Sequence, residues 1–316
     1  MKTYVVTGGA GFIGSHLTDA LLAAGHHVVV VDDFSTGKRA NLDPRCVVLE
    51  GDVRDPALLH QAMEGASGCF HLAAIASVEL ANRDWTGTHG VNQGGTVAVL
   101  NSARAAGLRP VVYASSAAVY GDIGGAVAHE ALEPKPLTAY GVDKYGSELH
   151  ARIGYHLHGV PSMGMRFFNV YGPRQDPHSP YSGVISIFAR RAKAGEVLIV
   201  NGDGQQTRDF VHVADVVSHL KAAMALLHHA PQQAVLNVCT GRSVTVQELA
   251  EQMLRASNAD PARITYGTVR SGDIRMSFGS NEVASARLSL RANIRLADGL
   301  RDLLLAPTAG QPASAD

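Results

Sequence analysis

The feature that most constrains the fold of this chain is a glycine-rich turn near its N-terminus. The β-branched run at 3–7 predicts a strand, and the amphipathic run at 12–24 predicts a helix. Between these two segments, Gly8, Gly11 and Gly14 recur at a regular spacing. In such a unit the first glycine permits a sharp turn, the second lets the backbone approach a pyrophosphate, and the third lets helix and strand pack closely. The turn therefore predicts a dinucleotide-binding βαβ unit.

The next predicted strand, 27–32, ends in Asp32, close to the spacing expected for a carboxylate that binds the adenosine ribose. A carboxylate there accepts hydrogen bonds from the ribose hydroxyls and repels a 2′-phosphate, which favours NAD over NADP. Two basic residues in the following loop, Lys38 and Arg39, leave this preference open. A nucleotide-hydrolysing phosphate loop needs a Lys-Ser/Thr pair after its last glycine, whereas Gly14 is followed by Ser-His. The sequence therefore excludes that loop.

Strand-like and helix-like segments alternate through the first half of the chain, as in a parallel sheet covered by helices. We therefore expect the α/β class, with a Rossmann-type doubly wound parallel sheet and a smaller C-terminal α/β lobe for the substrate. The expected divisions are 1–166 for the NAD-binding domain, 167–305 mainly for the substrate lobe, and 306–316 for a flexible tail. Strands are predicted at 3–7, 27–32, 46–50, 68–72, 110–115 and 160–166, and helices at 12–24, 91–106, 139–158, 184–194, 212–228 and after a capping box at Thr245 and Glu248.

Charge and cysteine content exclude several classes of protein. The 316 residues include 27 basic and 28 acidic side chains, so the net charge of −1 gives no general attraction to nucleic acid or to an anionic membrane. Three scattered cysteines fit neither a disulfide framework nor a zinc cluster, and the near pairs of histidines at 156–158 and 228–229 lack metal-site spacing. No apolar run is long enough to span a bilayer. We expect a soluble, cytoplasmic protein without metal.

A tyrosine and a lysine in the predicted helix 139–158 form a candidate catalytic pair. Tyr140 and Lys144 stand four residues apart, so they are neighbours on one face of the helix. A phenol is a useful base only when its pKa is lowered from about 10, and a nearby cation lowers it. Ser116 follows a predicted strand, at the edge where open α/β sheets bind ligands. A solvated surface pair and a turn-forming serine are the alternative interpretations of these residues.

The glycine turn, the strand-end carboxylate and the Ser-Tyr-Lys set together resemble the extended short-chain dehydrogenase/reductase family, in particular nucleotide-sugar epimerases of the UDP-glucose 4-epimerase type. The resemblance covers almost the whole chain, including the segments 71–74, 166–174 and 208–212. It implies a tightly bound NAD and catalysis by Ser116, Tyr140 and Lys144. It further implies that NAD is contacted by Gly8, Gly11, Phe12, Ile13, Gly14, Asp32, Asp33, Ser35, Gly37, Asp52, Val53, Leu72, Ala73, Ala74, Asn92, Tyr140, Lys144 and Phe167.

The resemblance also implies a UDP-sugar in the smaller lobe. Guanidinium groups suit the diphosphate because they bind phosphate bidentately. Family enzymes restricted to glucose and galactose carry a tyrosine where this chain has Ser277, so the resemblance implies room for an N-acetyl group. An alignment offset of one residue would make Ser277 an ordinary loop residue. The implied substrate contacts are Ser116, Ala117, Ala118, Tyr140, Asn169, Arg208, Arg270, Asp273 and Ser277.

The residue after Ser116 bears on the reaction. Relatives that dehydrate or decarboxylate nucleotide sugars carry an acid there, whereas this chain has Ala117. The resemblance thus implies an NAD-dependent UDP-hexose 4-epimerase that passes through a transient 4-keto sugar. The expected substrates are UDP-GlcNAc/UDP-GalNAc and UDP-Glc/UDP-Gal, and the expected assembly is a homodimer formed by the helices at 91–106 and 139–158. UDP-glucuronate 4-epimerase and a non-catalytic NAD-binding sensor remain alternatives. Departures from the family pattern at 278–282 and Cys239 affect the substrate lobe.

Overall fold

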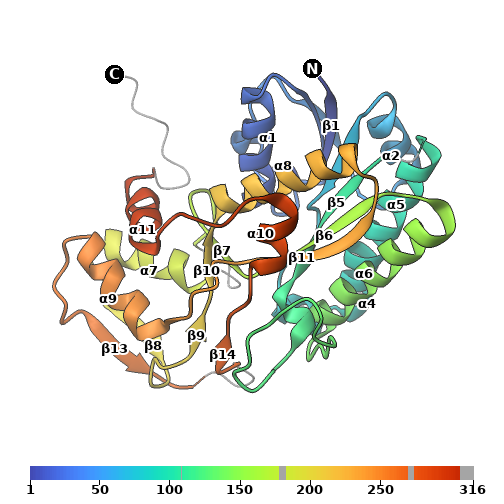
Figure 1. The fold of residues 1–316 in the computed structure, drawn as a ribbon. Coiled ribbons are helices and arrows are strands. Elements are labelled where there is room, and N and C mark those ends of the chain that lie inside the picture. The colour runs from blue at the N-terminus through green and yellow to red at the C-terminus, as the bar shows by residue number, and fades with distance from the viewer. Residues whose placement is uncertain (108, 178–182, 270–273, 307–316) are drawn as a thin grey trace.

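A computed structural model describes residues 1–107, 109–177, 183–269 and 274–306 of the chain (Figure 1). Its largest element is a seven-stranded sheet in which every strand pairs in parallel with its neighbours, in the order β11-β6-β5-β4-β1-β2-β3. The predicted parallel sheet and its six predicted strands are confirmed, with small shifts at the strand ends, whereas the seventh strand, β11, was not predicted. The strands are β1 (Thr3–Thr7), β2 (His27–Asp32), β3 (Val47–Glu50), β4 (Gly68–His71), β5 (Val111–Ser116), β6 (Ser162–Phe167) and β11 (Gln233–Val238).

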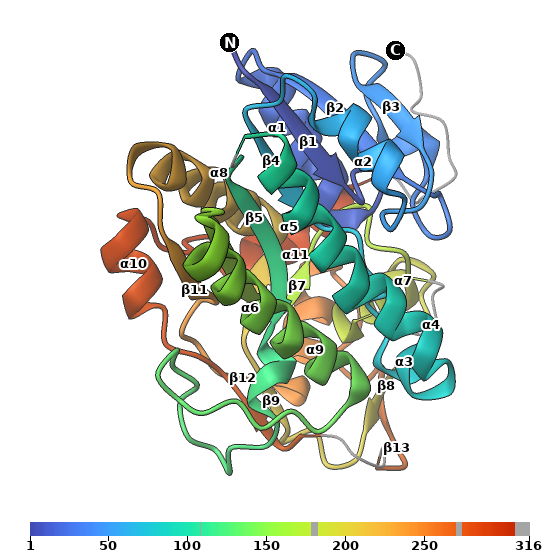
Figure 2. The ribbon, with the colours of Figure 1, turned by 90° about the vertical axis from the view of Figure 1, so that its right-hand side faces the viewer.

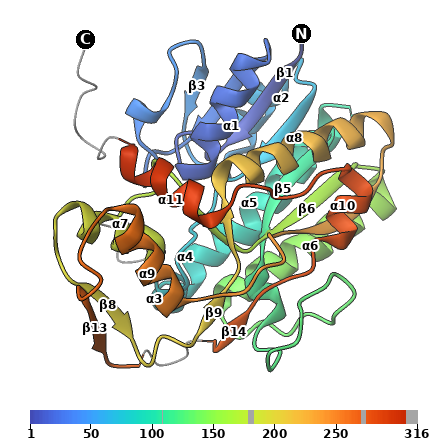
Figure 3. The ribbon, with the colours of Figure 1, turned by 60° about the vertical axis from the view of Figure 1, so that its left-hand side comes forward.

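Helices cover both faces of this sheet because buried apolar side chains alternate between the two faces along its strands. On β1, Tyr4 and Val6 face one layer of core, whereas Val5 faces the other. The first layer contains the apolar sides of α1 (Phe12–Ala23) and α8 (Val213–His229) (Figure 3). The second layer contains those of α2 (Pro56–Met63), α5 (Gly95–Ala105) and α6 (Ala139–His158), which stand in front of the sheet in Figure 2. The fold is therefore a three-layer, doubly wound sandwich.

The segment between β4 and α5 differs from the single helix predicted at 91–106. It contains two short helices, α3 (Val78–Arg83) and α4 (Trp85–His89), followed by a π-helical turn at Gly90–Gly94. Only then does α5 begin, at Gly95. Helix α6, by contrast, has the bounds that the sequence predicts, because Thr138 caps its first turn and Gly159 ends it in a left-handed conformation.

The smaller lobe has its own apolar core, made by helices packed on short strands (Figure 1). Thr245 and Glu248 form the predicted capping box at the start of α9. The elements of this lobe are β7 (Asn169–Tyr171), α7 (Val184–Lys193), β8 (Leu198–Asn201), β9 (Thr207–Arg208), β10 (Phe210–His212), β12 (Val244–Thr245), α9 (Val246–Ala256), β13 (Ile264–Gly267), β14 (Met276–Ser277) and α11 (Leu296–Leu305). Helix α10 (Glu282–Leu288) instead packs against α8 and β11 of the large sheet.

The chain does not divide at residue 167 into two successive parts. After β10 it returns to the large sheet, where α8 packs against α1 and β11 pairs with β6. The reason is that β6 would otherwise be an uncovered edge strand, and β11 pairs with it along its whole length. Residues 307–316 of the predicted tail lie outside the described residues. In the described ranges, no helix is long and apolar enough to cross a membrane.

Candidate active site

A cleft of about 590 Å³ opens at the carboxyl ends of the sheet strands, between the large sheet and the start of the smaller lobe. This edge is where doubly wound sheets bind ligands. The cleft brings together most of the residues expected from the sequence. Its lining includes Gly8, Gly11, Phe12, Ile13, Gly14, Asp32, Asp33, Ser35, Gly37, Asp52, Val53, Leu72, Ala73, Ala74, Ser116, Tyr140, Lys144, Phe167 and Asn169.

The glycine turn forms one wall of the cleft and leaves no space for a side chain at Gly8 or Gly14. Gly8 has a positive φ of 69°, and a Cβ there would lie 2.6 Å from the backbone nitrogen of Ala73. A Cβ on Gly14 would overlap the carbonyl oxygen of Gly8. Helix α1 starts at this point with Gly11 as its N-cap, so no side chain caps its first turn. Free N–H groups and the positive end of the helix dipole suit a pyrophosphate, so this wall fits the dinucleotide.

Asp32 fits the ribose end of the same dinucleotide. Its carboxylate accepts hydrogen bonds from the backbone N–H groups of Ala10 and Phe34, each at 2.9 Å. Each carboxylate oxygen retains a further lone pair, and the side chain lines the cleft. Burial raises the pKa of Asp32 above its usual value, while the two hydrogen bonds lower it. Lys38 and Arg39 form ion pairs with Asp176 and Glu50, so both cations have carboxylate partners.

Ser116, Tyr140 and Lys144 meet where β5 ends beside the first turns of α6. The Ser116 hydroxyl lies close enough to the Tyr140 phenol to lower the pKa of that phenol. The Lys144 ammonium lies 5.6 Å from the centre of the Tyr140 ring and donates a 3.0 Å hydrogen bond to the carbonyl of Ala114. A hydroxyl, a phenol and an ammonium therefore face one cleft within a few ångströms. Such a set can transfer a proton to or from a substrate hydroxyl.

The direction of the Tyr140 pKa shift differs from the one expected from sequence. Burial raises the pKa of Tyr140 to about 12, and the hydrogen bond with Ser116 only partly offsets this effect. Burial also lowers the pKa of Lys144 to about 8, although the nearby Asp143 carboxylate acts in the opposite direction. Desolvation penalises the charged form of each group and outweighs the attraction between them. The sequence-based expectation of a lowered tyrosine pKa is therefore wrong for the chain by itself.

The lowered pKa of Lys144 makes the stability of the protein depend on pH. The folded-state pKa is about 8, against 10.5 for an ordinary lysine, so between these values the unfolded chain binds more protons. The free energy of unfolding then rises by up to about 3 kcal/mol as the pH rises through this window, and this gain is lost again on acidification. We expect urea titrations at pH 8 and pH 10 to show this rise for the wild type relative to Lys144→Met. Parallel curves for the two proteins would contradict a buried ammonium.

Several residues expected at the site lie beside the cleft. The Asn92 side chain is buried and bonds to both the N–H and the carbonyl of Ile75, so it shapes the loop that lines the cleft. Ala117 and Ala118 begin the 3₁₀ turn after Ser116, and the Ala118 N–H donates to the Ser116 hydroxyl. These residues therefore support cleft-lining groups.

The expected diphosphate and sugar contacts of the smaller lobe are placed only in part. The Arg208 guanidinium donates to the carbonyls of Thr207 and Ile274, each at 2.7 Å. Ser277 pairs with Arg208 between β14 and β9. Arg270 and Asp273 lie outside the described residues. The contacts of these four residues with a substrate therefore stay a prediction.

The cleft also contains residues that were not expected. Ala114 and Ser115 precede Ser116 on a predicted strand, and Gln175 follows a segment similar to the family, so strand register and motif position could have indicated them. Val31 likewise lies on the predicted strand 27–32, and Phe168 and Val170 lie in the segment 166–174. The others are contributed by loops or element ends with no such signal. The additional lining residues are Val31, Thr36, Gly51, Ile75, Ala76, Val91, Ala114, Ser115, Phe168, Val170, Gln175 and Gly183.

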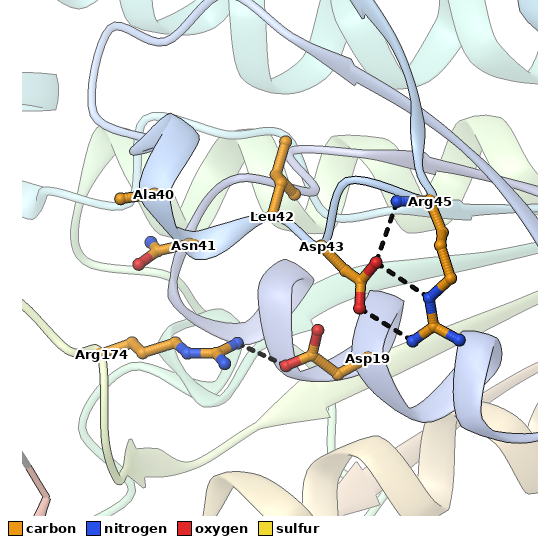
Figure 4. Close-up of a pocket in the computed structure, with 7 residues that line it drawn as sticks. All are labelled: Asp19, Ala40, Asn41, Leu42, Asp43, Arg45 and Arg174. Carbon is orange, nitrogen blue, oxygen red and sulfur yellow. Dashed lines mark hydrogen bonds and ion pairs between the residues drawn. The ribbon is translucent and has the colours of Figure 1, made fainter. Parts of the chain in front are cut away.

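A second, open hollow lies between α1 and the loop before β3 (Figure 4). Its charged groups are paired with each other: Arg174 with Asp19 at 2.8 Å, and Arg45 with Asp43 at 2.8 Å. These exposed pairs neutralise the charge of the hollow and have little energetic weight. None of the site residues predicted from the sequence and described by the structure lines this hollow.

Comparisons with a protein-family model and with curated proteins agree on the family of this chain. The sequence matches the NAD dependent epimerase/dehydratase family over residues 4–239. Among curated proteins, the UDP-glucose 4-epimerase of Mycolicibacterium smegmatis is 36% identical over 307 residues, which cover 95% of this chain and 96% of that protein.

Solved structures agree with this match along nearly the full length. UDP-glucose 4-epimerase of Thermotoga maritima, crystallised with UDP-glucose, superposes with a TM-score of 0.89 at 32% identity, covering 96% of this chain and 97% of that one. UDP-N-acetylglucosamine 4-epimerase of Methanobrevibacter ruminantium, in complex with UDP-N-acetylmuramic acid, superposes with a TM-score of 0.90 at 30% identity and the same coverage. The fold thus has counterparts among enzymes of nucleotide sugars.

Proposed function

Because the chain belongs to the NAD dependent epimerase/dehydratase family, as its motifs predicted, we propose that it is a UDP-hexose 4-epimerase. Its cofactor is NAD. The observation that carries the proposal is the Ser116 hydroxyl beside the Tyr140 phenol in the cleft, next to the buried Lys144 ammonium. The residue after Ser116 is Ala117, so this position lacks the acid that elimination of water requires. The substrates in the proposal are UDP-GlcNAc/UDP-GalNAc and UDP-Glc/UDP-Gal.

In this proposal the residues of the cleft have separate chemical roles. Bound NAD supplies the acceptor and donor of the C4 hydride. The Tyr140 oxygen takes the proton of the sugar 4-hydroxyl and later returns it, while Ser116 hydrogen-bonds to the same oxygen of the sugar. The Lys144 ammonium stabilises the phenolate and holds the ribose next to it. The 4-keto sugar turns about its diphosphate link and presents its other face before hydride and proton return.

A panel of UDP-sugars tests this assignment. We expect purified protein to interconvert the C4 epimers of UDP-glucose and of UDP-N-acetylglucosamine, measured by chromatographic separation of the products. Denaturation of the same sample is expected to release NAD. Conversion of UDP-sugars only to dehydrated or decarboxylated products would refute the epimerase, and no conversion at all would favour a binding protein.

The preference between plain and N-acetylated sugars is proposed to depend on Ser277, which is half-buried on β14 beside Arg208. Ser277→Tyr adds a ring where the small side chain leaves room. We expect kcat/KM for UDP-GlcNAc to fall at least tenfold relative to that for UDP-glucose. Met276→Tyr is the matched control, because neighbouring residues of a strand face opposite sides. An unchanged ratio of the two kcat/KM values in Ser277→Tyr, or an equal change in both variants, would show that Ser277 does not determine the substrate preference.

We extend the proposal to a homodimer formed through α5 and α6. Apolar side chains on these helices are exposed in the single chain, among them Val97 (37%), Ile153 (46%) and Leu157 (64%). A second copy that packs the same helices against them would bury this surface in a symmetric interface. Light scattering of the purified protein measures whether its mass is twice that of the chain.

A further inference from the structure

Side chains of α6 meet three successive residues at the end of β5. Lys144 donates to the carbonyl of Ala114, and the Ser116 hydroxyl lies beside the Tyr140 phenol, whose pKa it lowers. Between these contacts, the Ser115 hydroxyl donates a 2.5 Å hydrogen bond to the Glu148 carboxylate. Tyr140, Lys144 and Glu148 are spaced by four residues, so they lie on one face of the helix. Glu148 therefore continues the line of contacts that contains the two residues assigned to proton transfer.

Glu148 is held from its other side by Arg166 of β6. The guanidinium donates two hydrogen bonds to the carboxylate, of 2.9 Å and 2.7 Å, and both side chains are only 5% exposed. Arg166 is also the register partner of Ser115 between β6 and β5. Removing two charges from water is costly, and well-packed apolar residues give equal or greater stability at such sites. Stability alone therefore does not account for a paired charge below the cleft.

The same arginine connects the cleft with the smaller lobe. Its guanidinium carbon lies 4.7 Å from the centre of the Tyr120 ring, in the turn that follows Ser116. The Tyr120 hydroxyl donates to the Asn237 side chain at 2.7 Å, and the Asn237 amide donates to the carbonyl of Ser280 at 3.2 Å. Side-chain contacts thus run without a gap from α6 to the segment that follows β14.

We propose that Glu148 and Arg166 are positioning residues, whose buried pair fixes α6 against the end of β5 so that Tyr140 stays beside Ser116 in the cleft. The effect on turnover rests on the proposed function, whereas the effect on Tyr140 does not. Proton transfer requires the phenol within hydrogen-bond reach of the substrate, and small displacements of a reacting group are costly for the rate. The pair acts through Ser115 and the helix, without touching the substrate.

The test replaces the pair by apolar residues of similar size, Glu148→Leu/Arg166→Met, so that no charge is left buried alone. We expect a thermal midpoint close to that of the wild type, together with a kcat for UDP-glucose at least tenfold lower and a KM within threefold. In protein labelled with ¹³C at tyrosine Cζ, we expect the Tyr140 resonance to shift; Tyr140→Phe assigns it. Ser115→Ala, which removes one contact and no charge, is expected to shift the same resonance and to lower kcat at least threefold.

The control is Asp215→Asn, which disturbs another buried carboxylate, on α8. Asp215 accepts hydrogen bonds from the backbone of Asn293 and Ile294 and does not line the cleft. We expect it to lower the thermal midpoint and to leave kcat and the Tyr140 resonance unchanged. The proposal is overturned if the double variant keeps the wild-type kcat and an unshifted Tyr140 resonance. If the double variant does not fold, an unshifted Tyr140 resonance in Ser115→Ala overturns the proposal instead. A wild type that converts no UDP-sugar refutes the proposed function, and the Tyr140 resonance then decides this proposal alone.

Discussion

Tyr140→Phe is expected to lower kcat for UDP-sugar epimerisation by about 10²–10⁴-fold, the range associated with a positioned acid or base. The variant removes one oxygen atom and keeps the ring, so the packing of α6 and the glycine wall stay as they are. Ser116 and Lys144 remain in the cleft, but neither replaces the phenol as the group that accepts the 4-hydroxyl proton. NAD content and thermal midpoint are therefore expected to stay near the wild-type values.

Tyr155→Phe is the matched control for this experiment. Tyr155 lies on the same helix, and its hydroxyl donates a 3.2 Å hydrogen bond to the carbonyl of Pro231, away from the cleft. We expect its removal to leave kcat unchanged. Steady-state kinetics on both variants decides the matter: a Tyr140→Phe enzyme with more than a tenth of wild-type kcat would contradict the assigned base.

The second large effect is expected for Gly14→Ala, which should weaken NAD binding roughly 100-fold, equivalent to about 3 kcal/mol. The added Cβ would overlap the Gly8 carbonyl and lie 2.8 Å from the Gly9 Cα. All of these atoms belong to the turn that is proposed to hold the pyrophosphate, so the backbone must move away from the geometry proposed to bind it. We expect NAD to be lost during purification, measured as cofactor released on denaturation.

Gly154→Ala is the control for the glycine substitution. Gly154 lies within α6, and a Cβ there would meet nothing within 4 Å. Alanine is favoured over glycine inside a helix by about 0.5–1 kcal/mol, so this variant is expected to keep its NAD and to gain a little stability. Full NAD content in Gly14→Ala would show that the turn tolerates a side chain and would contradict its assignment.

The parts of the fold that could be predicted from sequence are those with strong local signals. The glycine turn, the β-branched strands and the bounds of α6 each depend on signals within a few residues, and the structure has them close to where the sequence placed them. The return of α8 and β11 to the large sheet could not be predicted in this way. It depends on which sheet edge is left open, and this is a property of the assembled molecule.

For the site, too, the features set by local sequence could be predicted, whereas those set by tertiary packing could not. Asp32, Ser116, Tyr140 and Lys144 follow from strand ends and helix spacing, and all four line the cleft. The direction of the Tyr140 pKa shift does not follow from such signals, because the burial of Tyr140 depends on the elements that pack over it. Near the departures from the family pattern, Ala128 exchanges backbone hydrogen bonds with Phe278 and Ser280, a contact between distant segments.

The most direct test of the central claim follows the hydrogen at C4 of the sugar. UDP-glucose labelled with deuterium at C4 is incubated with the purified protein in ordinary water, and the product is examined by NMR and mass spectrometry. If hydride leaves and returns in the cleft between Tyr140 and the cofactor, the UDP-galactose formed retains deuterium at C4 and its mass is unchanged. Loss of the label to solvent, or a product lacking water or carbon dioxide, would contradict a 4-epimerase.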